Sequence, residues 1–317
     1  MIGYLIKRIL LIIPTLLAVG VVTFFLLRVV PGDIVELKLR GDGAAVTQLA
    51  IERERARLGL DKPLINQFGD WITGVAVFNF GTSMWTGRPV TDEIAGRLVL
   101  SLQIAFLATL IGLLIAVPLG TISALFANSW IDYSIRVVTL AGLSMPSFWL
   151  GMLIIIALLH VFDWIPPMTP TSLWRDPLGQ LAQLFWPALA VGYRFSAIVA
   201  RMMRSSLVEV LHEDYIRTAR AKGLFERTVI IRHALRNALL PAITVSGLEF
   251  AFLIGGLVVT EQVFNLNGIG RLFVQAIINH DYIMIQALIM LTAFVFVVTN
   301  LVVDLVYAFL DPRIRYV

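Results

Sequence analysis

Few side chains in this sequence have the types and spacing of a catalytic or metal site. Lys222-Gly223 reverses the order of the Gly-Lys pair in a G-x-x-x-x-G-K-[ST] phosphate loop, and that loop is absent from the chain. His212-Glu213 has no second histidine at the spacing of a metal pair, and no G-x-S-x-G nucleophile turn occurs. The chain also has 0 Cys, which excludes thiolate chemistry and cysteine metal sites. We therefore expect no enzyme activity, no catalytic residue, no metal and no cofactor in this chain.

The composition is that of a protein that folds in a bilayer. Of its 317 residues, 58% are hydrophobic and 15% are charged, and the mean hydropathy is +0.86. Soluble domains are roughly 45–50% apolar and about 25% charged, so a cytosolic enzyme, a disordered chain and a secreted disulfide scaffold are excluded. The formal net charge of +4 is too small to indicate nucleic acid as a partner. We predict an all-α polytopic membrane protein in contact with lipid.

Six apolar segments are long enough for transmembrane helices, which need about 20 residues. In chain order they are residues 9–27, 98–131, 137–162, 177–200, 237–260 and 282–303. Arg194 interrupts the fourth segment and Glu249 the fifth. Prolines inside the segments either kink the helices or reflect the ordinary abundance of proline in membrane helices; they are Pro14, Pro118, Pro146 and Pro187.

Basic residues that flank these segments predict the topology. Lys7 and Arg8 precede the first segment, and eight Lys and Arg residues lie between positions 201 and 236, which places both regions in the cytoplasm. Six spans then place both termini there, together with Arg313 and Arg315. Residues 31–97 must be extracytoplasmic despite their basic residues, because acidic residues are interleaved and the segment is long.

This topology predicts three parts of the chain. Residues 1–30 form an N-terminal anchor helix, and residues 31–97 form an extracytoplasmic segment between helices 1 and 2. Residues 98–317 form a five-helix core that includes the cytoplasmic loop 201–236.

The cytoplasmic loop contains a short helix with its own start and stop signals. Glu213 and Asp214 lie in its first turn, cations lie in its last turn, and Gly223 provides the C-terminal cap. Ile216, Ala219 and Gly223 share one small face, which could insert into a cleft of another protein. Three cations surround that face, namely Arg217, Arg220 and Lys222. Alternatively, a basic amphipathic helix of this kind lies on anionic headgroups.

The same loop resembles a known family. The run Tyr215-Ile216-Arg217-Thr218-Ala219-Arg220-Ala221-Lys222-Gly223-Leu224, continued by Arg232 to Pro241, is similar to the cytoplasmic signature loop of binding-protein-dependent ABC importer permeases. Its form is that of the dipeptide, oligopeptide and nickel branch, and the likeness extends over nearly the whole chain. Further matching pieces are Pro146-Ser147-Phe148-Trp149-Leu150-Gly151, Glu261-Gln262-Val263-Phe264 and Asp311-Pro312-Arg313. The general permease pattern differs from this chain at Arg217-Thr218, His233 and Arg236.

The resemblance implies a heteromeric importer in the bacterial inner membrane. Its other members would be a second permease subunit, two cytoplasmic ATPases that bind ATP and Mg, and an extracytoplasmic solute-binding protein. Residues 213–224 would couple ATP hydrolysis to transport, through Glu213, Asp214, Tyr215, Arg217, Ala219, Arg220, Lys222 and Gly223. The resemblance leaves the cargo open between a dipeptide, a longer peptide, a metal complex and another solute.

An ion-gradient-driven secondary transporter or channel is the alternative function. It would need ionisable groups within the membrane, for which Arg194, Glu249 and Asp304 are candidates. Arg194 and Glu249 lie at similar depth, so an interhelical salt bridge is the favoured interpretation. In the other interpretation they line the translocation path and contact the two ends of a zwitterionic solute.

The extracytoplasmic segment also has two interpretations. Arg53, Arg55 and Arg57 are candidates for contact with the solute-binding protein, because this segment is the largest outside the membrane and carries both signs of charge. Alternatively, the segment only packs over the helix bundle.

Overall fold

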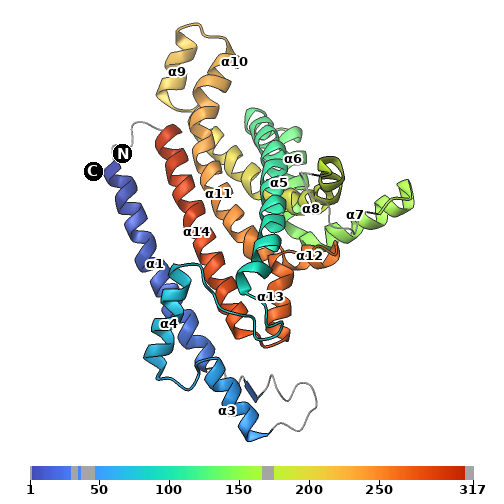
Figure 1. Ribbon diagram of the computed structural model, residues 1–317. Coiled ribbons are helices and arrows are strands. Elements are labelled where there is room, and N and C mark those ends of the chain that lie inside the picture. The colour runs from blue at the N-terminus through green and yellow to red at the C-terminus, as the bar shows by residue number, and fades with distance from the viewer. Residues whose placement is uncertain (1, 30–34, 37–46, 166–174, 311–317) are drawn as a thin grey trace. The chain divides into compact units, whose positions relative to one another are not determined.

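The described residues fold almost entirely into helices (Figure 1). The computed structural model describes residues 2–29, 35–36, 47–165 and 175–310. No strand occurs in these ranges, where an isolated bridge joins Thr82 to Pro89, so the all-α prediction is confirmed. Arg313 and Arg315, which the topology places in the cytoplasm, lie outside the described residues.

The helices vary from single turns to rods longer than a bilayer is thick. They are α1 (Ile2–Val29), α3 (Gln48–Arg57), α4 (Leu64–Ala76), α5 (Val90–Leu125), α6 (Trp130–Ser144), α7 (Ser147–Phe162), α8 (Pro177–Leu211), α9 (Asp214–Ala221), α10 (Glu226–Thr228), the π-helix η1 (Val229–Ala234), α11 (Leu235–Gly256), α12 (Val258–Val263), α13 (Ile269–Ile278) and α14 (Tyr282–Leu310).

Four helical stretches in the described residues are long and apolar enough to cross a membrane. They are Arg8–Arg28, Val90–Leu125, Glu226–Gly256 and Tyr282–Val306, and a bent pair, α6 with α7, would make a fifth. α8 contains the predicted span 177–200 and is not among them, and it carries Arg194, Arg201 and Arg204. The six-span count and its topology therefore stay predictions.

The predicted span over residues 137–162 is broken at Pro146, one of the prolines that the sequence offered as kinks. α6 ends at Ser144, α7 begins at Ser147, and the two helices are bent by 101°. Pro146 explains the break, because it has no N–H and holds the preceding residue, Met145, in an extended conformation with φ −89° and ψ 126°. The other prolines noted in the sequence, Pro14, Pro118 and Pro187, lie inside continuous helices.

The chain forms two compact units. The first comprises Met1–Leu100 with Asn267–Val297, and the second comprises Ser101–Leu266 with Val298–Val317. The core of the first unit is built from α5, α13 and α14, and includes Ile94, Leu272 and Leu288. This division follows packing within the chain, so the three-part division at residues 30 and 97 stays a prediction.

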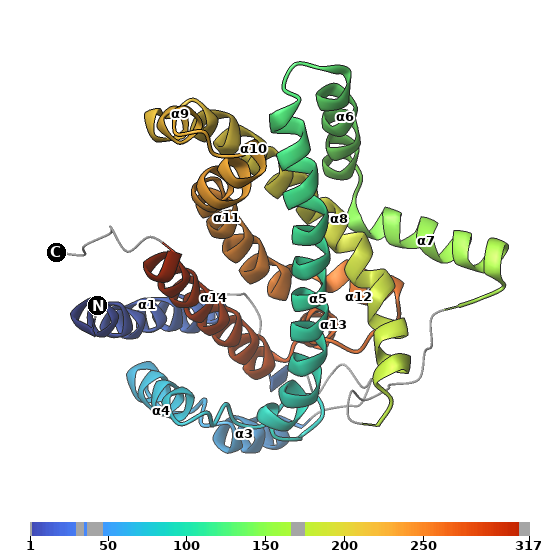
Figure 2. The same cartoon turned by 90° about the horizontal axis from the view of Figure 1, so that it is seen from above.

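α8 organises the second unit. It begins at an Asp176-Pro177 pair, in which the Asp176 carboxylate accepts the N–H of Gly179 at 2.9 Å. It then packs against α6, α7 and α11 (Figure 2). Gly192 is required here, because a Cβ at this position would lie 2.7 Å from the carbonyl oxygen of Ala108 on α5.

Candidate functional site

The predicted cytoplasmic helix is α9, and its ends agree with the sequence signals. It covers Asp214–Ala221, with Glu213 at the N-cap and Lys222 at the C-cap. Gly223 has φ +76°, a left-handed conformation that glycine adopts without strain. The N–H of Gly223 donates to Arg220 O at 2.9 Å and that of Leu224 to Ala219 O at 3.4 Å, which is the Schellman pattern. The predicted helix and its glycine cap are confirmed.

One face of α9 is buried in the second unit itself. Ile216 is 0% exposed and Ala219 is 7% exposed, and both belong to the core that contains Leu207 of α8 and Val229 of η1. The sequence expected this face to insert into a partner protein, whereas it packs against helices of the same chain, and the coupling role of Ala219 stays a prediction. An apolar helix face is stable when it is buried against another surface, and here α8 and η1 of the same chain form that surface.

The polar side of α9 is exposed and held by local contacts. Arg217 Nη1 lies 3.2 Å from Asp214 Oδ1 within the helix. Arg220 donates from Nε and Nη2 to the two carboxylate oxygens of Glu226, at 3.2 and 2.7 Å. The hydrogen bonds that the Arg220 guanidinium donates to Glu226 raise the pKa of Arg220. Asn237 Nδ2 donates to Tyr215 Oη at 2.7 Å and ties α9 to α11.

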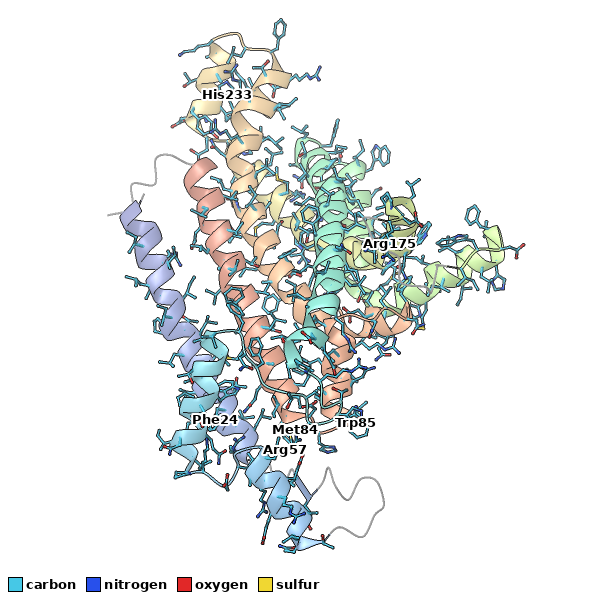
Figure 3. The ribbon with its side chains drawn as sticks, viewed as in Figure 1. Phe24, Arg57, Met84, Trp85, Arg175 and His233 are labelled. Carbon is cyan, nitrogen blue, oxygen red and sulfur yellow. The ribbon has the colours of Figure 1, made fainter. Side chains whose placement is uncertain are left out.

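The residues after Gly223 form part of the same surface, which extends past the predicted coupling segment 213–224 to Phe225 and Glu226. Phe225 is 85% exposed and Leu224 is 41% exposed. The π-helix η1 follows, and His233 lies in it (Figure 3). π-helices are rare and occur frequently at functional sites. We call residues 213–226 without Ile216 and Ala219 the α9 surface.

Arg194 and Glu249 do not form the salt bridge that the sequence favoured. Among the described residues, no hydrogen bond or ion pair joins them, and Arg194 is exposed while Glu249 is partly buried. The ion pair that α8 does form is Arg204 with Asp132 of α6, with nitrogen-to-oxygen distances of 2.7 and 2.6 Å. Ser123 also donates to the buried Asp132 carboxylate, at 2.6 Å. Sequence spacing gave no signal for this cluster, because its members lie on three helices.

The loop between residues 81 and 90 belongs to the first unit and is fixed by one distant carboxylate. Asp281, which is 2% exposed, accepts from the Ser83 hydroxyl and from the N–H of Met84 at 3.1 Å. The N–H of Met284 donates to the same carboxylate at 3.1 Å, so Asp281 also caps α14. Trp85 follows in the loop and is 57% exposed (Figure 3).

The three arginines predicted to contact a solute-binding protein lie on α3. Arg53, Arg55 and Arg57 are exposed. Arg57 Nη2 lies 2.6 Å from Glu54 Oε1 in the same helix. In the described part of the chain, no group of three or more His, Asp or Glu residues is placed to hold a metal ion.

Comparison with known proteins connects these features to one family. Residues 116–316 match the family described as binding-protein-dependent transport system inner membrane component, and residues 1–105 match its N-terminal region. A peptide transport system permease protein of Brucella abortus (strain 2308) is 40% identical over 316 residues, which is 100% of each chain. The glutathione transport system permease protein GsiC of Escherichia coli (strain K12) has the same identity and coverage.

A solved structure has the same fold. The inward-facing MetNI methionine ABC transporter aligns with a TM-score of 0.53 and 17% identity, and the alignment covers 67% of this chain and 93% of that chain. The sequence family, the full-length relatives and the fold agree. The chain therefore belongs to the binding-protein-dependent transport system inner membrane components, the multi-pass permeases of ABC importers.

Proposed function

We propose that this permease moves small peptide-like solutes into the cell across the bacterial inner membrane. The names of the relatives support this class of cargo, because one is a peptide permease and another a glutathione permease. The complex would contain a second permease subunit, two cytoplasmic ATPase subunits and an extracytoplasmic solute-binding protein. Within this proposal the cargo stays open between a dipeptide, a longer peptide, a metal complex and another small solute.

Permeases of this family work with partner ATPases, which agrees with the absence of a phosphate-binding loop from this sequence. In our proposal the partners bind ATP and Mg, and this chain holds no cofactor. The ion-gradient-driven alternative loses its basis, because the chain belongs to an ABC importer family. Arg194 and Glu249 remain candidates for lining the translocation path.

The α9 surface is our candidate for the contact with the ATPases. The observation that carries this proposal is the combination of a buried and an exposed side on one short helix. Ile216 anchors α9 in the core of the second unit, while Tyr215, Arg217 and Phe225 are exposed. A partner that moves α9 would therefore move α8 and η1 with it. ATP binding, which draws the two ATPases together, would be converted into a change of access in the helix bundle.

The exposed arginines of α3 are our candidates for the extracytoplasmic partner. Arg53 and Arg55 would form charge-assisted contacts with acidic groups of a solute-binding protein. This contact determines the on-rate more than the affinity, so its effect should weaken as salt concentration rises.

The test replaces Phe225 with Ser in the reconstituted complex. Phe225 is exposed in this chain, so the substitution leaves the fold intact and removes only what a partner would cover. We expect the ATPase activity stimulated by the cargo-loaded binding protein to fall by about tenfold, as for an aromatic contact at the centre of an interface. The measurement is stimulated against basal ATP hydrolysis in liposomes.

The matched control is Phe126→Ser. Phe126 is 51% exposed and lies beyond the end of α5, outside the α9 surface. Its replacement should leave stimulation unchanged. If Phe225→Ser couples normally, or if both variants lose stimulation equally, the α9 surface is not the contact that transmits ATP binding.

A further inference from the structure

A cavity of about 460 Å³ lies in the first unit, where one candidate span ends and another begins. The span Arg8–Arg28 contributes its last turn, through Phe24 and Arg28, and the span Tyr282–Val306 contributes its first turn. The volume lies within the roughly 300–1,000 Å³ of small-molecule sites. Because both spans reach the membrane boundary at the cavity, it lies at the depth of lipid headgroups.

Aromatic side chains around the cavity indicate the same depth. The Phe24 ring lies 5.3 Å from the ring of Phe68 and 5.7 Å from that of Trp71, both on α4. Of these side chains, Trp71 is of the type enriched at the membrane–water interface. α4 has no buried residues and exposes Leu64 and Ile65, as an interfacial helix does. Figure 3 shows Phe24, Arg57 and Met84, all of which line the cavity, at one end of this unit.

Two hydrogen-bond donors at the cavity have no anionic partner. Gln286 is 4% exposed, lines the cavity, and its Nε2 has no hydrogen-bond partner among the described residues. Arg28 lies 4.4 Å above the Phe24 ring and donates from Nη2 to the neutral amide oxygen of Gln67 at 2.6 Å. In the described ranges, no carboxylate pairs with Arg28. A buried donor without a partner costs free energy, so an acceptor group is the complement of this site.

The other cations of the cavity already have carboxylate partners. Arg57 lies 2.6 Å from Glu54, and Lys62 lies 2.7 Å from Asp70. Arg28 and Gln286 therefore lack an acceptor, and one anionic group with several oxygens, placed between them, would provide it. A phosphate diester has this chemistry.

We infer that the cavity binds the phosphate group of an anionic phospholipid. The acyl chains would continue along the side of α1 that carries Arg28, where Leu17 is 47% exposed and Val21 is 38% exposed at helical spacing from it. These residues lead directly to Arg28, and this continuity favours a lipid over a water-soluble solute. In the predicted topology the lipid belongs to the outer leaflet. The inference depends on the span boundaries and not on the identity of the cargo.

The test is native mass spectrometry of the intact complex, purified from nanodiscs that contain phosphatidylglycerol and then delipidated in steps. The unmodified complex should retain phosphatidylglycerol after bulk lipid is lost. Arg28→Gln and Gln286→Leu should each lower the retained fraction, Arg28→Gln by about tenfold, because it removes a charge-assisted contact. Arg28→Lys keeps the charge without the planar guanidinium, so its retained lipid fraction should lie between those of the unmodified complex and Arg28→Gln.

Arg57→Gln is the matched control, because Arg57 lines the same cavity but already has Glu54 as its partner. It should retain the lipid as the unmodified complex does. Equal retention in all variants would overturn the inference. In nanodiscs of phosphatidylcholine alone, a rise of the unfolding temperature with inorganic phosphate, or with a peptide carrying a free carboxylate, would overturn it too, since the site would then serve a soluble anion. Stabilisation that requires phosphatidylglycerol would support it.

Discussion

The loop after α9 and the loop before α5 are each held by a carboxylate, but the two carboxylates differ in origin and surroundings. Glu226 binds Arg220, which is six residues away, on the exposed α9 surface. Asp281 binds Ser83, which is 198 residues away, and both side chains are buried. Water can replace Glu226 as a partner, whereas nothing can replace Asp281. The distant, buried contact should therefore contribute far more to stability than the local one.

The largest effect is expected from Asp281→Ala. The change leaves the buried Ser83 hydroxyl and the N–H groups of Met84 and Met284 without an acceptor. At roughly 1–3 kcal/mol for each unsatisfied donor, we expect a loss of about 3–5 kcal/mol. The measurement is the thermal unfolding midpoint and the assembled yield of the complex.

Asp70→Ala provides the comparison within the same unit, because Asp70 is an exposed carboxylate that pairs with Lys62. Its unfolding midpoint should match that of the unmodified complex. Similar midpoints for Asp281→Ala and Asp70→Ala would mean that burial does not separate these carboxylates, and the contrast between the two loops would be lost.

An intermediate effect is expected from Gly223→Val. A Cβ at Gly223 has no heavy atom within 4 Å, so the cost comes only from its φ of +76°. A β-branched residue in this left-handed conformation costs about 1–2 kcal/mol, while asparagine tolerates it better. Hydrogen exchange of the α9 amides should accelerate in Gly223→Val and much less in Gly223→Asn.

Equal exchange rates in the two variants would show that the glycine is not needed for its conformation. The C-terminal end of α9 would then not depend on the left-handed conformation at residue 223.

The parts of the structure that sequence predicts well depend on neighbours in the chain. Acids at Glu213 and Asp214 and the glycine at position 223 mark the ends of α9, and each signal acts within one turn. Amphipathicity also identified the face of Ile216 and Ala219 as apolar. Amphipathicity could not show what this face packs against, because a face buried in the core of its own chain and a face buried in a partner's cleft carry the same apolar side chains.

The parts that sequence missed depend on distant segments. Asp281 and Ser83, like Arg204 and Asp132, meet only after the chain has folded, and no spacing rule connects them. Pro146 was visible as a helix breaker, but the 101° bend depends on what α7 packs against, namely α8 and α12. Sequence therefore indicated where the helix is interrupted and not where the chain goes next.

The smallest effect is expected from breaking the exposed pair at the α9 surface. A double-mutant cycle of Arg220→Gln and Glu226→Gln should give a coupling energy below about 1 kcal/mol that shrinks further as salt is added. The hydrogen bond that Arg220 donates to Glu226 raises the pKa of Arg220, so at high pH the ion pair is lost only above that elevated value, and at low pH it is lost when Glu226 is protonated. Stability of the α9 surface should thus be constant from about pH 6 to 9. A coupling energy above about 2 kcal/mol, or a marked loss of stability within that pH range, would place this exposed pair in the same class as the buried Asp281 contacts and remove the distinction between the two loops.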